Sequence, residues 1–128
     1  DFDEDKINIG DQFQINECLL QISQPRIPCY KIGIKLNSRE FPKMFSQSGL
    51  LGSYLRVIHD GEISPGDTIH KVHSEENSMS VKDIAHLLFV DVKNIELMKQ
   101  ALDIKPLTEE IKEKFRERLM KLGDFSSL

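Results

Sequence analysis

The sequence predicts a mainly β fold with an α-helical appendage, in which a small β-barrel is followed by a three-helix unit. Apolar and polar residues alternate with a period of two in several short runs within residues 7–73, but from residue 80 apolar residues recur every three to four positions. The β-rich runs are short and separated by Gly turns, which favours a closed or nearly closed barrel over a flat sheet. The change of period divides the chain into a β-domain at 1–73, a polar linker at 74–79 and a three-helix domain at 80–123.

The β half opens with a strand, a turn and a second strand. Ile7 and Ile9 alternate with polar neighbours, and a turn at Gly10-Asp11 leads into the next alternating run. A later β-rich run is followed by Asp60-Gly61, a dipeptide typical of tight hairpins, so a hairpin is expected there. The expected strands are residues 7–9, 13–15, 18–22, 54–58 and 68–72.

Two Gly-Asp dipeptides precede expected strands. Gly10-Asp11 comes before the run at 13–15, and Gly66-Asp67 comes before 68–72. Because Gly permits a positive φ, both dipeptides are expected at corners of the barrel. The intervening segment 33–53 is rich in Gly, Ser and Pro and has no clear period, so a functional loop and a disordered excursion are both open.

Three helices are expected after the linker. Ser80 with Asp83 resembles a capping box, Asp91 is expected to cap the second helix, and Thr108 is expected to start the third. Gly123 is expected to end the last helix. The expected apolar stripes are Ile84, Leu87 and Leu88; Ile95, Leu97, Met98, Ala101 and Leu102; and Ile111, Phe115, Leu119 and Leu122.

Composition excludes some classes of function. The chain has 128 residues, 39% of them hydrophobic, which is enough for a core. A net charge of −4 argues against a nucleic acid polymer as the partner, since phosphate binding needs clustered Lys and Arg. The sequence has no apolar run of about 18 residues, so no membrane partner is expected. Residues 1–6 are acidic rather than basic, unlike a signal peptide, and the first residue is not Met, which suggests a fragment.

The two cysteines lack the spacing of a disulfide framework or a zinc site. Both are interpreted as reduced thiols of a cytoplasmic protein, with Cys18 in the core of its strand. The four histidines have no metal-ligand spacing, and neither a nucleophile elbow nor a phosphate-binding Gly motif is present.

Cys29 lies in the segment 24–31, which also contains two prolines and two cations. Pro25 and Pro28 fix their own φ and favour extended backbone before them, which gives a stiff segment. Arg26 and Lys31 would favour the thiolate form if they lie close to the sulfur. The competing interpretation is a small buried Cys beside two solvated cations.

The segment 46–52 is a second candidate. Its Ser and Gly residues, Ser48 and Gly49 among them, can present hydroxyl and backbone N–H groups to an anion such as a phosphate. Combined with a positioned Cys and the cations Arg26, Lys31 and Arg56, this segment suits a ligand with both a phosphate and a thiophilic centre.

These residues also resemble a known family. Gly10 to Ile15, Gln24 to Lys31, Phe45 to Val57 and Gly61 to Asp67 are similar to the MOSC domain, named for the C-terminal domain of molybdenum cofactor sulfurases. Residues 80–122 resemble the three-helix appendage of its YiiM-like bacterial branch. The family's His-Gly-Gly segment and Gly-Glu-Asn-Leu stretch are absent, which suggests that the N-terminal part of the domain is missing.

The resemblance implies a barrel similar to that of pyruvate kinase and a protein that binds the molybdenum cofactor (molybdopterin). Cys29 would be the metal ligand and catalytic residue. Reduction of N-hydroxylated compounds such as hydroxylaminopurine is the implied activity, with an electron-donor reductase and a homodimer as further expected partners. The alternatives are a non-catalytic sulfur- or cofactor-carrier module and a barrel whose motifs serve only packing. The implied cofactor-binding residues are Cys29, Arg26, Lys31, Ser48, Gly49 and Arg56.

Overall fold

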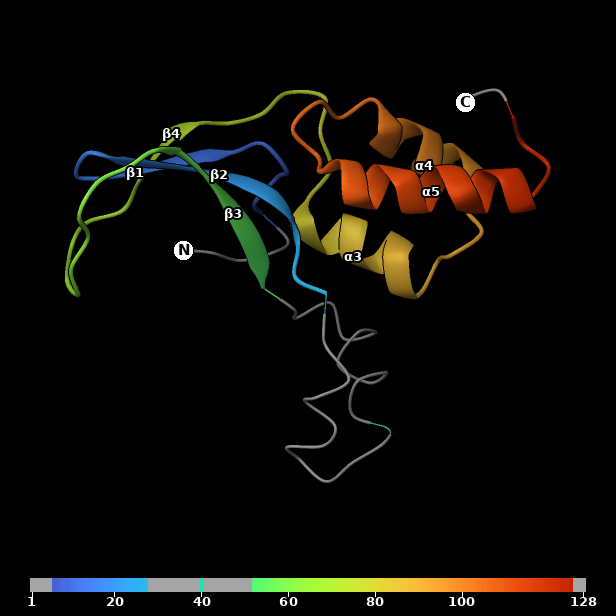
Figure 1. The fold of residues 1–128 in the computed structure, drawn as a ribbon, viewed down its shortest axis with the longest axis horizontal. Coiled ribbons are helices and arrows are strands. Elements are labelled where there is room, and N and C mark those ends of the chain that lie inside the picture. The colour runs from blue at the N-terminus through green and yellow to red at the C-terminus, as the bar shows by residue number, and fades with distance from the viewer. Residues whose placement is uncertain (1–5, 28–39, 41–51, 126–128) are drawn as a thin grey trace.

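A computed structural model of the chain describes residues 6–27, 40 and 52–125 (Figure 1). In the described part, four strands are followed by three helices. The strands are β1 (Gln12–Ile15), β2 (Cys18–Pro25), β3 (Ser53–His59) and β4 (His70–His73). The helices are α3 (Val81–Phe89), α4 (Ile95–Leu102) and α5 (Glu109–Lys121).

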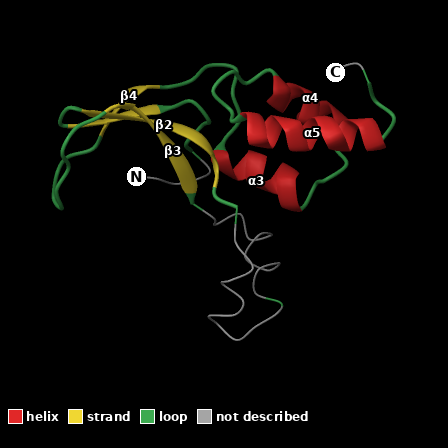
Figure 2. Cartoon of the chain, viewed as in Figure 1, coloured by secondary structure: helices red, strands yellow, loops and turns green. Residues whose placement is uncertain are grey.

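The strands form one antiparallel sheet in the order β3-β2-β1-β4 (Figure 2). β1 and β2 are joined by a two-residue turn in which Asn16 has a φ of 53°. Phe13 pairs with Leu20 across these two strands, and Leu20 pairs with Val57 of β3. The mainly β fold with a helical appendage is therefore confirmed. Within the described residues the sheet is open, with β3 and β4 at its edges.

The open edge leaves part of an apolar sheet face uncovered. On that face Ile22 and Phe13 are buried, but Leu55 and Val57 of β3 are 42% and 55% exposed. A closed barrel would bury all four of these side chains, because they share the face that its interior would use. The described strands thus have the apolar face expected of a barrel, but they do not close into one.

The prediction of a hairpin at Asp60-Gly61 is wrong. β3 ends at His59, and the next strand, β4, lies at the opposite edge of the sheet. Gly61 has no left-handed φ but lies against the turn between β1 and β2, where an added Cβ would meet Cys18 N at 2.5 Å. The glycine at this position is required by a close approach of two backbones, not by a hairpin turn.

One hydrophobic core joins the sheet to the helices. Ile9, Phe13 and Ile22 pack in the same cluster as residues from all three helices. The run 7–9, expected as a strand, pairs with residues 79–81: Val81 N donates to Ile7 O at 2.9 Å and Ile9 N to Met79 O at 3.0 Å.

The proposed domain boundaries stay a prediction. No helix in the described ranges is long and apolar enough to cross a membrane.

The helix starts are set by local capping. Ser80 accepts from Asp83 N at 3.0 Å and caps α3, as expected. The cap of α4 is Asn94, which accepts from Leu97 N, so the assignment to Asp91 is wrong; Asp91 instead accepts from the Asn94 amide at 2.8 Å. Thr108 precedes α5 as expected.

The apolar stripe of α5 is confirmed except at its end. Ile111, Phe115 and Leu119 are fully buried, whereas Leu122 is 38% exposed because it follows the last helical turn. Gly123 has a φ of 82° and follows the helix as expected.

Arg118 of α5 closes the end of α3. Its guanidinium donates to Leu87 O at 3.0 Å and to Leu88 O at 2.7 Å, two carbonyls at the C-terminal end of that helix. Its carbon Cζ lies 6.0 Å from the centroid of the Phe115 ring. Burial lowers the pKa of Arg118 from its ordinary value.

Arg118→Met is expected to lower the free energy of unfolding by about 1–3 kcal/mol, because two helix-end carbonyls lose a charged donor. Arg116→Met is the matched control on the same helix. Arg116 bonds to Glu109 and Glu113, and the hydrogen bond to Glu109 raises its pKa. Because both carboxylates are exposed to solvent, little change is expected. Urea denaturation measures both variants, and equal losses would contradict the role given to Arg118.

Candidate functional site

The six candidate cofactor residues divide into two groups. Arg26 and Arg56 are described by the structure and are both exposed. The remaining four, Cys29, Lys31, Ser48 and Gly49, lie outside the described residues.

The exit of β2 is fixed beside the entry to β3. Pro25 pairs with Ser53, and Arg26 N donates to Gly52 O at 3.1 Å. In the sequence, Cys29 is three residues after Arg26, and Gly49 is three residues before Gly52. The hydrogen bond therefore brings together the two ends of the segment that contains four of the six candidates.

The strand end that precedes Arg26 is buried and fully hydrogen-bonded. Gln24 is 3% exposed. Its Oε1 accepts from the Thr108 hydroxyl at 2.7 Å, and its Nε2 donates to Pro25 O at 3.2 Å. Pro25, whose ring fixes φ, is also fully buried. The extended backbone predicted for this segment is therefore present at its described end, where β2 runs to Pro25, and its stiffness stays a prediction.

Arg56 is placed differently from Arg26. It lies opposite Gln21, four residues beyond Gly52 on β3, or about 13 Å along an extended strand. Its guanidinium donates to Gln21 Oε1 at 2.8 Å and to Pro106 O at 3.3 Å. In this structure Arg56 links the sheet to the connection between α4 and α5, and its contact with a cofactor stays a prediction.

The turn before β1 joins three parts of the chain through Asp11. This side chain is fully buried. It accepts from Asn8 N at 3.0 Å and Glu75 N at 2.8 Å, and it pairs with Lys71 Nζ at 2.9 Å. Neighbouring Gly10 has a φ of 97°, as expected for a corner. The Gly-Asp dipeptide thus holds β1, β4 and the connection to α3 together.

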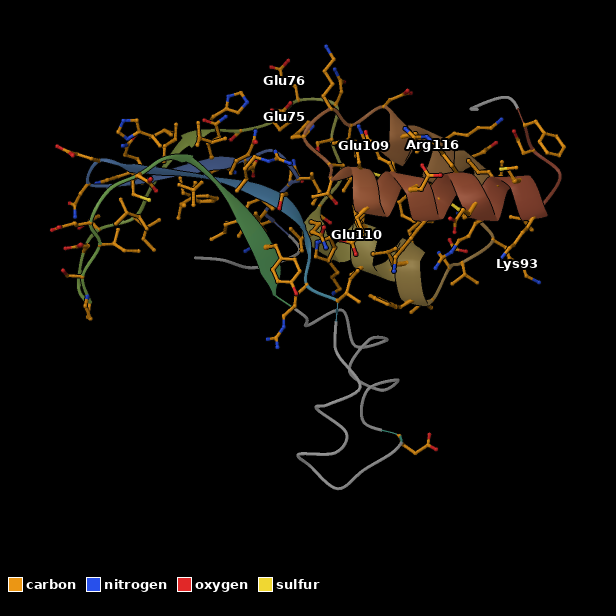
Figure 3. The ribbon with its side chains drawn as sticks, viewed as in Figure 1. Glu75, Glu76, Lys93, Glu109, Glu110 and Arg116 are labelled. Carbon is orange, nitrogen blue, oxygen red and sulfur yellow. The ribbon has the colours of Figure 1, made fainter. Side chains whose placement is uncertain are left out.

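Acidic side chains lie on α5 and on the connection between β4 and α3. Figure 3 shows Glu109 and Glu110 in the first turn of α5, and Glu75 and Glu76 on the connection after β4. The acidic first turn complements the positive end of the helix dipole. Among residues 6–27, 40 and 52–125, no group of three or more His, Cys, Asp or Glu side chains is arranged to hold a metal ion.

Sequence reasoning missed the roles of Gln24, Thr108 and Asp11. In the sequence, Gln24 is part of a motif and Thr108 marks the start of a helix, but their mutual hydrogen bond spans 84 positions. The sequence predicts that Asp11 lies in a turn, but its full burial has no local signal.

Family comparisons agree with this architecture. The MOSC domain model matches residues 1–70, and the model of the YiiM-like, 3-alpha helix domain matches residues 79–122. The chain belongs to the MOSC domain family. Its helical unit is the three-helix domain of the YiiM-like members, and it packs on the MOSC sheet through the shared core.

Individual relatives of this MOSC chain are known. The crystal structure of YiiM from Geobacillus stearothermophilus superposes with a TM-score of 0.84 at 34% identity, covering 91% of this chain and 60% of that one. The uncharacterized protein YflK of Bacillus subtilis is 31% identical over 90% of this chain and 52% of its own length. A protein of Gibberella moniliformis named Reductase is 26% identical over 91% of this chain and 21% of its own length. The chain thus spans about half the length of YflK.

Proposed function

We propose that this chain forms the thiolate-bearing part of a molybdenum-cofactor-dependent oxidoreductase that reduces N-hydroxylated compounds such as hydroxylaminopurine. Membership of the MOSC family supports the cofactor, and the fungal relative named Reductase supports the reaction class. The observation that carries the proposal is the Arg26 N to Gly52 O bond. It joins the start of the Cys29 segment to the end of the Ser48-Gly49 segment.

The available donor set fits such a cofactor. A thiolate is a soft ligand suited to a metal of this kind, and Cys29 would be its source. Arg26, exposed at a rigid strand end, would contact the phosphate, with Lys31 and the hydroxyl and backbone N–H groups of Ser48 and Gly49 beside it. The bound cofactor would supply the redox chemistry, and a separate reductase would supply electrons. The protein contributes ligation, orientation and charge.

Cys29→Ser tests this proposal. The wild-type protein, purified from a host that makes the cofactor, is expected to contain molybdenum and to reduce hydroxylaminopurine with a chemical electron donor. Cys29→Ser is expected to lose both, because a serine hydroxyl is a hard, protonated ligand at neutral pH. Cys18→Ala is the matched control: Cys18 is a buried core thiol, and its replacement should leave the metal content unchanged.

Two results would contradict the reductase. One is a metal content in Cys29→Ser equal to that of the wild type. The other is a folded wild-type protein without molybdenum. In the second case, mass spectrometry of peptides from the unreduced protein shows whether Cys29 has an additional sulfur, as a carrier module requires.

A further inference from the structure

We infer that a cavity between α3, α4 and the segment before β1 binds a small organic amine with an apolar body. The cavity has a volume of about 390 Å³. This volume falls in the range of small-molecule sites, about 300–1,000 Å³. Neither Arg26 nor Arg56 lines the cavity, so the inference goes beyond the function proposed above and does not depend on it.

The walls of the cavity are held by contacts between segments far apart in the sequence. Asn8, on one wall, forms an antiparallel bridge with Ser80 on another. Between them, the Ser78 hydroxyl donates to Ile9 O at 2.7 Å. Because these contacts are made within the protein, the hollow is formed before any ligand enters it, as is usual for a small-molecule site.

The cavity has an apolar floor and a polar rim. Met79 and Leu87 are buried in the shared core, and Leu97 packs against that core. At the rim, the exposed side chains of Asp83 and His86 lie about one turn apart on α3. No lysine or arginine is among the described residues that line the cavity, so its charge favours a cation over an anion.

The Asp83 carboxylate is available because the capping box at the start of α3 is only half formed. Ser80 accepts from Asp83 N at 3.0 Å. In a complete box, a Glu or Gln side chain at this position bonds the backbone N–H of the capping residue in return. Asp83 is one methylene shorter, and its carboxylate bonds no other residue in the described part of the chain. The exposed Gln100 amide on α4 adds a carbonyl acceptor at the same rim.

An amine with an apolar body matches both parts of the cavity. Its ammonium group would donate a charge-assisted hydrogen bond to the Asp83 carboxylate, with Gln100 Oε1 as a second acceptor. Its apolar part would lie over the Met79 and Leu87 side chains, which removes apolar surface from water. A carboxylate or phosphate ligand would instead meet the like charge of Asp83.

Three probes of similar shape test the chemistry of the site. Benzylamine has the ammonium group, benzyl alcohol replaces it with a neutral hydroxyl, and benzoate reverses the charge. Each is titrated into the isotope-labelled wild-type protein, and the amide NMR spectrum records which residues respond. Benzylamine is expected to shift the amides of Asp83, His86 and Gln100 in a saturable way, with a Kd on the order of millimolar for so small a ligand. Benzyl alcohol should bind about fivefold more weakly, the factor for one net hydrogen bond, and benzoate more weakly still.

Asp83→Asn removes the charge at nearly constant shape and is expected to raise the Kd for benzylamine about fivefold. Glu96→Gln is the matched control, because Glu96 is an exposed carboxylate in the first turn of α4 that does not line the cavity. It should leave the Kd unchanged.

Four results would overturn the inference. These are benzylamine shifts that do not saturate, shifts spread over the whole protein, equal binding of benzoate, and an equal change of Kd in Asp83→Asn and Glu96→Gln. If Asp83→Asn does not fold, the three probes on the wild-type protein still decide, since equal binding of benzylamine and benzyl alcohol would exclude the role of the carboxylate.

Discussion

Asp11→Ala is expected to lower the free energy of unfolding by about 3–5 kcal/mol, because it leaves two backbone N–H groups without an acceptor in a buried site. These groups belong to Asn8, which lies before β1, and to Glu75, which lies on the connection between β4 and α3. The ion pair with Lys71 adds little, since the lysine side chain is 39% exposed. Urea denaturation monitored by circular dichroism measures the loss.

The matched control is Asp67→Ala, in the second Gly-Asp dipeptide. Asp67 also accepts from a backbone N–H, that of Ser64, and from the Asn16 amide, but in an exposed loop. Water can replace the carboxylate there, so a loss of about 1 kcal/mol is expected. Asp11→Asn, which keeps one acceptor oxygen, should fall between the two. Equal losses for Asp11→Ala and Asp67→Ala would show that burial of Asp11 is not what makes it important.

The two Gly-Asp dipeptides show what a sequence can and cannot predict. Both were expected at corners, and both glycines do have a positive φ, 97° at Gly10 and 91° at Gly66. That property is local, because only the backbone conformation of the residue matters. Their surroundings are not local. Asp11 is fully buried and bonds Glu75 and Lys71, whereas Asp67 lies in an exposed loop and bonds Asn16 and Ser64. The sequence pattern alone therefore could not predict which of the two aspartates is buried and contributes more to stability.

The same division applies to the rest of the fold. Hydrophobic periods located the strands and helices, because each period depends on neighbouring residues. Strand order is a long-range property, and the Asp60-Gly61 signal wrongly suggested that the next strand would pair with β3. Asp91 and Asn94 are both good capping residues three positions apart, so propensity could not choose between them.

The candidate site could be predicted only in part. The Pro-rich sequence around Cys29 predicted a stiff segment, and its described end is buried and hydrogen-bonded. The sequence could not distinguish Arg26 from Arg56 as cofactor ligands, because the residues next to a cation do not indicate which group it will bond. In the structure Arg26 lies beside Gly52, and the Arg56 guanidinium donates a hydrogen bond to Pro106 O.

Gly10→Ala is expected to lower the free energy of unfolding by about 2–5 kcal/mol, from two separate causes. An L-residue at this positive φ costs about 1–2 kcal/mol. The added Cβ would also lie 2.6 Å from Pro106 Cγ and 2.7 Å from Glu75 Cγ. The Glu75 side chain can move away, but the proline ring belongs to the rigid connection between α4 and α5, and overpacking of this kind costs about 1–3 kcal/mol.

Gly66→Ala isolates the first cause. Gly66 has nearly the same φ, and an added Cβ would meet no atom within 4 Å, so only the conformational cost of about 1–2 kcal/mol is expected. The difference between the two variants measures the contact of the Gly10 turn with Pro106. Because Arg56 bonds the carbonyl of the same proline, Gly10→Ala should also weaken the contact between sheet and helices. Faster exchange of the amides at the start of α5 in Gly10→Ala, but not in Gly66→Ala, is the expected sign. Equal stability losses and equal exchange in the two variants would mean that Pro106 moves freely and that the sheet-to-helix joint lies elsewhere.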